Sequence, residues 1–225
     1  GFLIHVYSTS YMQEESNASF ARYFSYLNLF VFSMLLLVMG GNYVILFMGW
    51  EGVGLCSYLL IGFWFKNPAY TKAANKAFIM NRIGDLAFLL AVFWLITKTG
   101  SASFSEVFSF ITANQGTTKF TSTDITIVSL LLFIGATGKS AQLPLYTWLP
   151  DAMAGPTPVS ALIHAATMVT AGIYMIARSN VLYSLAPLTL SIISWVGLAT
   201  AFIAATIALR QYDIKKVRSE EHTSE

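Results

Sequence analysis

The chain has 225 residues, of which 56% are hydrophobic and 11% are charged, and its formal net charge is only +2. Soluble domains contain about 45–50% apolar and about 25% charged residues, so this composition excludes a disordered chain and an ordinary soluble enzyme. The small net charge argues against nucleic-acid partners. The single cysteine, Cys56, excludes an internal disulfide and cannot supply the ligands of an iron–sulfur cluster.

Long apolar runs, separated by polar or Pro- and Gly-containing segments, predict an all-α polytopic membrane protein with about six transmembrane helices. Crossing ~30 Å of hydrocarbon takes about 20 apolar residues, and the runs are too long to be β-strands. Thr71 can cap the third span, and Pro187 suits the first turn of the sixth. The expected spans are residues 22–40, 42–65, 72–97, 124–148, 155–178 and 186–210.

Residues 101–115, between the third and fourth spans, have the pattern of a short amphipathic helix. Ser103 and Glu106 have the spacing of a capping box. We expect this helix to lie in the membrane interface, and a plain loop is the alternative. Four apolar residues share its predicted buried face: Phe104, Val107, Phe108 and Ile111.

The two ends of the chain differ in character from the spans. Residues 1–5 read as the last turn of an apolar helix. The apolar character stops after Val217, and residues 218–225 (RSEEHTSE) resemble the in-frame translation of a sequencing adapter. We expect this octet to be non-native and exclude its His222 as a ligand, with a genuine polar tail as the alternative.

Basic residues are unevenly distributed between the two ends of the spans. Lys98, Lys119 and Arg178 fall on one side of the membrane if successive spans alternate in direction. The positive-inside rule predicts that the other, more basic side faces the cytoplasm, or the matrix of a mitochondrion. That side holds Arg22, Lys66, Lys72, Lys76, Arg210, Lys215 and Lys216.

Five ionisable residues lie within the expected spans: Glu51, Arg82, Asp85, Lys139 and His164. A charge at the centre of a bilayer costs ~2.5–3.5 kcal/mol on insertion scales, so these side chains should face other helices or water and should find partners. Two acids, two bases and one histidine can nearly neutralise one another. Such a set is typical of a proton or ion pathway.

Lys139 is followed by Pro144 in the same apolar run, which predicts that the fourth span is broken. Proline has no N–H and clashes with the preceding turn, and a broken helix at membrane depth is tolerated where it lines a cavity. A buried lysine favours its neutral form, whereas a nearby carboxylate favours the ammonium. A lysine whose acidic neighbour can approach or retreat can therefore take up and release a proton.

Structural explanations are also open for these residues. Arg82 and Asp85 are three residues apart, so they can pair on one helix face as a self-neutralising brace. Glu51 lies in a glycine-rich segment that allows a neighbouring helix to approach closely. His164 can act as a proton relay, or as a neutral imidazole bonded to a backbone carbonyl.

Four segments resemble motifs of one family. Residues 50–62 (WEGVGLCSYLLIG) resemble the fifth-helix motif of the largest antiporter-like, proton-pumping membrane subunit of respiratory complex I, called chain L in bacteria and chain 5 in mitochondria. Residues 81–85 resemble its sixth helix, residues 138–153 its broken seventh helix, and residues 155–165 the start of its eighth. The resemblance extends over nearly all of residues 1–217.

The resemblance implies a fold of two inverted helical repeats, each with one broken helix. Residues 1–40 would be the end of the N-terminal region, and residues 41–217 the antiporter-like domain, with the first repeat and the start of the second. The resemblance further implies that Glu51 and Lys139 form a buried pair in a proton channel. It places His164 on the relay towards the centre and also implicates Asp85.

The function implied is proton translocation across an energy-conserving membrane by a subunit of NADH:quinone oxidoreductase, a translocase. Electron transfer would occur on other subunits, and NADH, FMN, the iron–sulfur clusters and quinone would be held by partner subunits. No redox site, cofactor or metal is expected on this chain, whose partners would be the other membrane-arm subunits of complex I, the lipid bilayer and protons.

Two other functions share these features. A large subunit of a multisubunit Na⁺/H⁺ antiporter would have the same Glu/Lys pair and the same broken helix. A membrane scaffold would use the charges only to brace its helices. The residues around 76–82 and the cysteine at position 56 favour a bacterial plasma membrane, with the mitochondrial inner membrane as the alternative.

Overall fold

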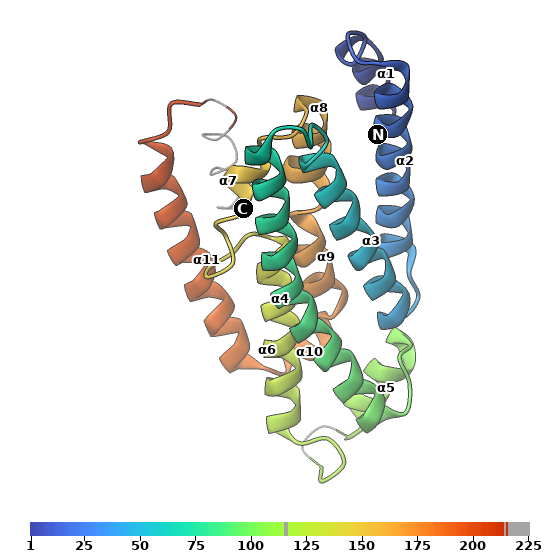
Figure 1. Ribbon diagram of the computed structural model, residues 1–225. Helices are drawn as coiled ribbons and strands as arrows, with labels where there is room; N and C mark the ends of the chain where they lie inside the picture. Colours follow the sequence, from blue (N-terminus) through green and yellow to red (C-terminus); the bar gives the residue numbers. More distant parts are fainter. Residues whose placement is uncertain (115–116, 214, 216–225) are drawn as a thin grey trace.

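The computed structural model describes residues 1–114, 117–213 and 215, and these ranges are mostly helical, without a β-sheet (Figure 1). Six helical runs within them are long and apolar enough to cross a membrane, which confirms the predicted all-α fold with about six spans. These runs are α2 (Asn17–Met39), α3 (Tyr43–Ile61), α4 (Pro68–Thr99), α6 (Ser122–Lys139), the composite run Thr157–Arg178, and α11 (Pro187–Ala208).

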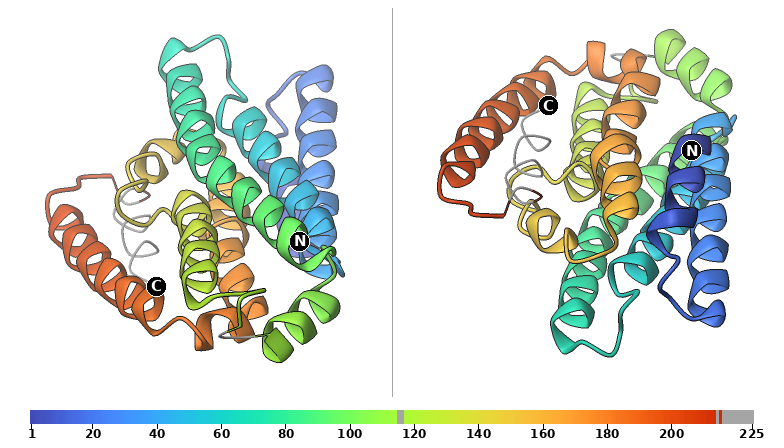
Figure 2. Two further views of the ribbon diagram at one scale, coloured as in Figure 1. Left: turned by 90° about the horizontal axis from the view of Figure 1, so that it is seen from below. Right: turned by 90° about the horizontal axis from the view of Figure 1, so that it is seen from above.

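The long helices run up and down in a bundle, with α2 and α11 at opposite edges (Figures 1 and 2). Helix α4 packs against both α3 and α6, and α9 (Thr170–Arg178) packs against α6 on another side. Helix α11 stands further out than the others, and few of its residues are buried. One of its links to the bundle is a hydrogen bond of 2.7 Å between the hydroxyls of Ser129 and Thr189.

Helix α4 begins earlier than predicted. Its N-cap is Asn67, whose side-chain oxygen accepts the backbone N–H of Ala69 at 3.0 Å, and Pro68 occupies the first helical position. Proline suits that position because its φ is already helical and its missing N–H would have no partner there. The cap predicted at Thr71 is therefore wrong, and the helix gains about one turn.

The start of α6 is fixed by a reciprocal capping box. Thr121 Oγ1 accepts the backbone N–H of Asp124, and the Asp124 carboxylate accepts the backbone N–H of Thr121. The same carboxylate accepts hydrogen bonds from Trp94 and Lys98 of α4. Asp124 of the capping box thus also connects α6 to α4 near this end of the bundle.

Glycines of α3 allow α2 to approach closely, as predicted for the segment around Glu51. A Cβ atom added at Gly49 would lie 2.6 Å from the Cα of Leu37, and one added at Gly52 would lie 2.6 Å from Oγ of Ser33. Both neighbours belong to α2, so the two helix backbones touch where larger side chains would separate them.

The short helix predicted between the third and fourth spans is present as α5 (Phe104–Asn114), at one end of the bundle (Figure 1). Its residues Phe104, Val107 and Ile111 are buried. The Phe104 ring lies 4.5 Å from that of Tyr43 of α3, centre to centre. The apolar face therefore packs on the protein, and the position of this helix in the membrane interface stays a prediction.

The remaining helices are short or irregular. Helix α1 (Phe2–Tyr11) forms a separate ten-residue helix, longer than the single turn predicted at the start of the chain. The fifth span begins with α8 (Thr157–Val159), continues as the π-helix η1 (Ser160–Thr167), and ends with α9. Helix α10 (Asn180–Ser184) leads into α11. The expected non-native segment 218–225 lies outside the described residues.

Candidate functional site

Four of the five ionisable residues predicted within the spans form a row of alternating charge. Glu51 of α3 forms an ion pair with Arg82 of α4. Arg82 and Lys139 both approach Oδ2 of Asp85, at 3.9 Å and 3.4 Å respectively. We call Glu51, Arg82, Asp85 and Lys139 the charged row. With two acids and two bases, the row carries no net charge.

The charged row leads from the periphery of the bundle to its interior. The side chains of Glu51 and Arg82 are 22% and 40% exposed, whereas those of Asp85 and Lys139 are 5% and 1% exposed. Charges attract more strongly where solvent does not screen them, and removing one partner of a buried pair is costly. The Asp85–Lys139 contact is therefore the part of the row on which protein stability and protonation depend most.

Asp85 is oriented by a residue that the sequence analysis did not single out. Trp50 Nε1 donates a hydrogen bond of 2.6 Å to Asp85 Oδ1, which leaves Oδ2 facing Lys139 and Arg82. The Trp50 ring packs edge-on against Phe88 at 5.1 Å and lies 5.8 Å from Lys139 Nζ. Trp50 thus fixes the carboxylate and also forms part of the surroundings of the ammonium.

Lys139 is the last residue of α6, so the helix ends before Pro144, where the break was predicted. Residues 140–148 form no regular helix, and α7 (Leu149–Ala152) follows. Ala141 adopts a left-handed backbone conformation with φ of 49°, which an α-helix cannot continue. Lys139 therefore occupies the carbonyl end of a helix, where the helix dipole favours a cation.

Polar groups of the broken segment bond to neighbouring helices. Ser140 Oγ donates to the Val169 carbonyl at 2.7 Å, and the Leu143 N–H donates to Thr200 Oγ1 of α11 at 3.1 Å. Irregular backbone at membrane depth requires such partners because lipid offers none. Figure 1 shows the segment part-way along the bundle, between α11 and the helices α4 and α6.

His164 lies in the π-helix η1 and is completely buried. Its Nε2 shares a hydrogen bond of 3.0 Å with Oγ of Ser57 on α3, rather than with a backbone carbonyl. Its Nδ1 is buried without a hydrogen-bond partner among the described residues. The His164 ring packs edge-on against Trp148 at 6.1 Å, and Trp148 Nε1 donates to the carbonyl of Gly138, next to Lys139. Trp148 therefore links His164 to the end of α6.

Within the described part of the chain, Glu51 and Lys139 do not form the direct ion pair that the resemblance implied. The reason is the position of α4, which packs against both α3 and the end of α6. Its residues Arg82 and Asp85 contact Glu51 and Lys139 respectively. Arg82 and Asp85 each have a closer ionic partner on another helix than on α4, so they are not simply a local brace.

Sequence reasoning missed three residues of the site: Trp50, Gly54 and Ser57. Trp50 and Gly54 were read only as parts of a motif, although a tryptophan beside a buried acid is a candidate hydrogen-bond donor. A Cβ atom added at Gly54 would lie 2.6 Å from Lys139 Nζ, so this glycine leaves room for the ammonium. No local signal connects Ser57 with His164, which lies 107 residues further along the chain.

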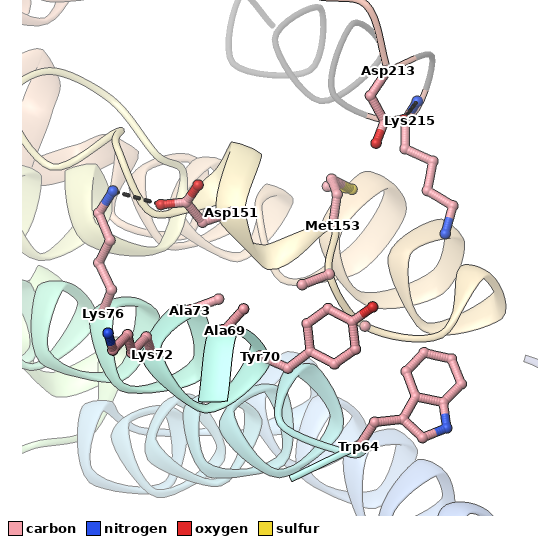
Figure 3. Close-up of a pocket in the computed structure, with 12 residues that line it drawn as sticks. Trp64, Ala69, Tyr70, Lys72, Ala73, Lys76, Asp151, Met153, Asp213 and Lys215 are labelled. Carbon is pink, nitrogen blue, oxygen red and sulfur yellow. Dashed lines mark hydrogen bonds and ion pairs between the residues drawn. The ribbon is translucent and has the colours of Figure 1, made fainter. Parts of the chain in front are cut away.

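A pocket of about 660 Å³ lies elsewhere, between the first turns of α4, the segment around α7 and the residues after α11 (Figure 3). The ion pair between Lys76 and Asp151, 2.7 Å long, lies at one end, with Trp64, Tyr70 and Lys215 at the other. No residue of the charged row lines it. Asp151 is half-exposed here.

Comparison with known proteins gives the family. Residues 40–218 match the family described as NADH:quinone oxidoreductase/Mrp antiporter, transmembrane. The chain is 53% identical to NADH-quinone oxidoreductase subunit L of Campylobacter jejuni over 95% of its length and 35% of that protein. It is also 53% identical to NADH-ubiquinone oxidoreductase chain 5 of Metridium senile, over 96% of its length and 34% of that protein. The chain thus spans about a third of the length of these curated relatives.

Solved structures agree with this fold. A chain of the Mrp complex from a Dietzia species superposes with a TM-score of 0.77 and 33% identity, over 88% of this chain and 21% of that one. A chain of the membrane-bound sulfane sulfur reductase, an archaeal respiratory complex, superposes with a TM-score of 0.79 and 21% identity, over 94% of this chain and 34% of that one. This likeness concerns the fold alone. Because the family match covers most of its length, the chain belongs to the NADH:quinone oxidoreductase and Mrp antiporter family of transmembrane proteins.

Proposed function

We propose that this protein translocates protons across an energy-conserving membrane as a subunit of NADH:quinone oxidoreductase, coupled to electron transfer on other subunits. The observation that carries the proposal is the charged row, which leads from half-exposed Arg82 to fully buried Lys139 at a helix break. Identity of 53% to a protein named as subunit L supports the assignment. Ionisable groups inside a membrane are typical of proton pathways.

In the proposed cycle, Lys139 is the residue that takes up and releases the proton. Asp85 Oδ2 lies between Lys139, at 3.4 Å, and Arg82, at 3.9 Å, so a small displacement changes which cation it neutralises. Opposite charges 4 Å apart attract by on the order of 4 kcal/mol at an effective dielectric constant of about 20. When Asp85 turns to Arg82, Lys139 loses this attraction and releases its proton towards His164. When Asp85 returns, Lys139 takes up another proton.

Glu51 completes the row at its outer end. Its ion pair with Arg82 keeps the arginine from neutralising Asp85 fully. Weakening that pair would free Arg82 to attract Asp85 away from Lys139. Arg82 itself keeps its proton at any accessible pH, so its role is to move charge and not to carry the proton.

The wider context is part of the same proposal. The partners would be the other membrane-arm subunits, the lipid bilayer and protons, with NADH, FMN, iron–sulfur clusters and quinone held by partner subunits. Residues 41–217 would form the first antiporter-like repeat and the start of the second, after an N-terminal region ending at residue 40. We propose the bacterial plasma membrane because of residues 76–82 and Cys56. The mitochondrial inner membrane is the alternative, because equally similar relatives come from Campylobacter jejuni and Metridium senile.

The test uses the full-length protein within its complex, in sealed vesicles. Proton uptake is measured per electron transferred for Lys139→Ala, Lys139→Arg and, as a control, Lys119→Ala in an exposed loop. Both Lys139 variants should lose the uptake that depends on this subunit, because neither alanine nor arginine can exchange a proton. If Lys139→Arg keeps the wild-type ratio, Lys139 is not a proton carrier.

A second candidate is the large subunit of a multisubunit Na⁺/H⁺ antiporter. The specific observation in its favour is the 33% identity and TM-score of 0.77 to a chain of the Mrp complex. The two functions differ in their energy source. Proton movement that requires electron transfer in the same complex supports the oxidoreductase, whereas movement driven by a sodium gradient alone supports the antiporter.

A further inference from the structure

Three positions of α3, each one turn from the next, contact the groups of the site. Glu51 pairs with Arg82, Gly54 lies against the Lys139 ammonium, and Ser57 bonds to His164. Residues three apart on a helix are neighbours. Successive turns of α3 therefore contact the outer end of the charged row, its inner end at Lys139, and then His164.

Gly54 determines where the Lys139 ammonium lies. The residue is buried, and a Cβ atom added to it would lie 2.6 Å from Nζ and 3.9 Å from Cε of Lys139, with no other atom of the described residues within 4 Å. The space that a side chain would fill is thus occupied by the lysine head group alone. The ammonium reaches the backbone of α3 because position 54 is glycine.

Ser57 lies one turn further along α3 and is itself buried. Successive turns of a helix are about 5.4 Å apart, so the Ser57 hydroxyl lies on the turn next to the one that the Lys139 ammonium contacts at Gly54. The Ser57 hydroxyl bonds to His164 Nε2 at 3.0 Å. Trp148, bonded to Gly138 and packed on His164, keeps the histidine close to the end of α6 independently of Ser57.

We infer that Ser57 is a relay residue that passes the proton from Lys139 to His164, and that Gly54 is the positioning residue that holds the Lys139 ammonium within reach of it. This inference rests on the function proposed above. It adds a hydroxyl on α3 to a path otherwise made of ionisable groups. The position of Lys139 against Gly54 and the Ser57–His164 hydrogen bond carry it together.

No proton is gained or lost overall in the transfer. His164 begins neutral, with its proton on Nδ1, so that Nε2 accepts the hydrogen bond from Ser57. Lys139 gives one proton, directly or through one water, to Ser57 Oγ while Ser57 gives its own to Nε2. The products are a neutral lysine, an unchanged serine and an imidazolium. Release of the Nδ1 proton and a return of the ring tautomer then restore the starting state.

The test compares Ser57→Ala with Ser57→Thr and with Ser129→Ala in the full-length protein within its complex. Ser129 is a matched control, because it is also a buried helical serine bonded to another side chain, Thr189, away from the row. Ser57→Ala should lower proton uptake per electron to the value of Lys139→Ala. Ser57→Thr keeps a hydroxyl and should restore uptake, and Ser129→Ala should keep the wild-type ratio.

The outcomes separate this inference from the proposed function. If Lys139→Ala lowers uptake and Ser57→Ala does not, the relay is wrong and the proposed function stands. If Lys139→Ala itself leaves uptake unchanged, the proposed function fails. Equal losses in Ser57→Ala and Ser129→Ala, or no recovery in Ser57→Thr, would mean that packing and not the hydroxyl matters, and would overturn the inference.

Gly54→Ala gives an independent measurement. Its methyl group would lie 2.6 Å from the Lys139 ammonium and displace it, so uptake per electron should fall to the Lys139→Ala value while the complex still assembles. The control is Gly197→Ala in α11, where an added Cβ meets no atom of the described residues within 4 Å. Wild-type uptake in Gly54→Ala would show that the place of the ammonium is unimportant and would overturn the positioning role.

Discussion

Asp85 and Lys139 are 54 residues apart in the chain, yet their side chains meet at 3.4 Å in the interior of the bundle. The Asp85 carboxylate has one oxygen bonded to Trp50 and the other facing Lys139. This arrangement gives the lysine an acidic neighbour whose second oxygen is held by a tryptophan. The charged row differs in this respect from a simple acid–base pair.

Asp85→Asn, compared with a double variant, should separate the effect of the Asp85–Lys139 pair on thermal stability from its effect on proton uptake. The substitution leaves the Lys139 ammonium buried beside a neutral amide, and breaking a buried pair costs about 3–5 kcal/mol. The double variant Asp85→Asn/Lys139→Met removes both charges and should regain most of the lost thermal stability, while proton uptake stays lost in both. Thermal unfolding of the purified complex and uptake per electron are the two measurements. Equal instability of the single and double variants would show that the charges are not coupled.

Arg82→Gln should affect coupling more than stability. The arginine side chain is 40% exposed, and exposed ion pairs contribute at most about 1 kcal/mol. Removing its charge leaves Asp85 with Lys139 as its only cation in the charged row, so the lysine should release protons less readily and uptake per electron should fall. A loss of thermal stability as large as that of Asp85→Asn, with uptake retained, would instead favour the brace interpretation.

The number and approximate positions of the transmembrane helices could be predicted, because the hydropathy of each apolar segment depends only on its own residues. The start of α4 was also within reach, since Asn67 followed by Pro68 is the usual order of an N-cap and a first helical residue. The end of α6 was not, because it depends on the backbone conformation at Ala141 rather than on the proline that follows.

The residues of the site could be predicted better than the contacts between them. Glu51, Arg82, Asp85 and Lys139 were identified because charged residues within apolar runs are rare. Which acid meets which base depends on α4 packing against both α3 and α6, and no rule of sequence spacing contains that information. The same holds for Ser57 and His164, and for Gly54, whose role is visible only once the lysine head group is placed against it.

Gly49→Ala should weaken the contact between α2 and α3. A Cβ atom at this position would lie 2.6 Å from the Cα of Leu37, and backbone cannot move away as a side chain can. Overpacking of this kind costs about 1–3 kcal/mol. Thermal unfolding should show the loss for Gly49→Ala and no loss for Gly41→Ala, where an added Cβ meets no described atom within 4 Å. Unchanged stability of Gly49→Ala would mean that the helices pack less closely in the membrane.

Thiol labelling should reveal which side of the membrane each end of the bundle faces. Lys66 and Thr118 are exposed and lie at opposite ends, before α4 and before α6. The only cysteine of the chain, Cys56, is buried, and its replacement by alanine gives a background without thiols in this chain. The more basic end, which includes Lys66, should face the cytoplasm or matrix by the positive-inside rule. In intact bacterial cells, an impermeant thiol reagent should therefore label Thr118→Cys and leave Lys66→Cys unlabelled until the membrane is opened. The reverse pattern would invert the orientation.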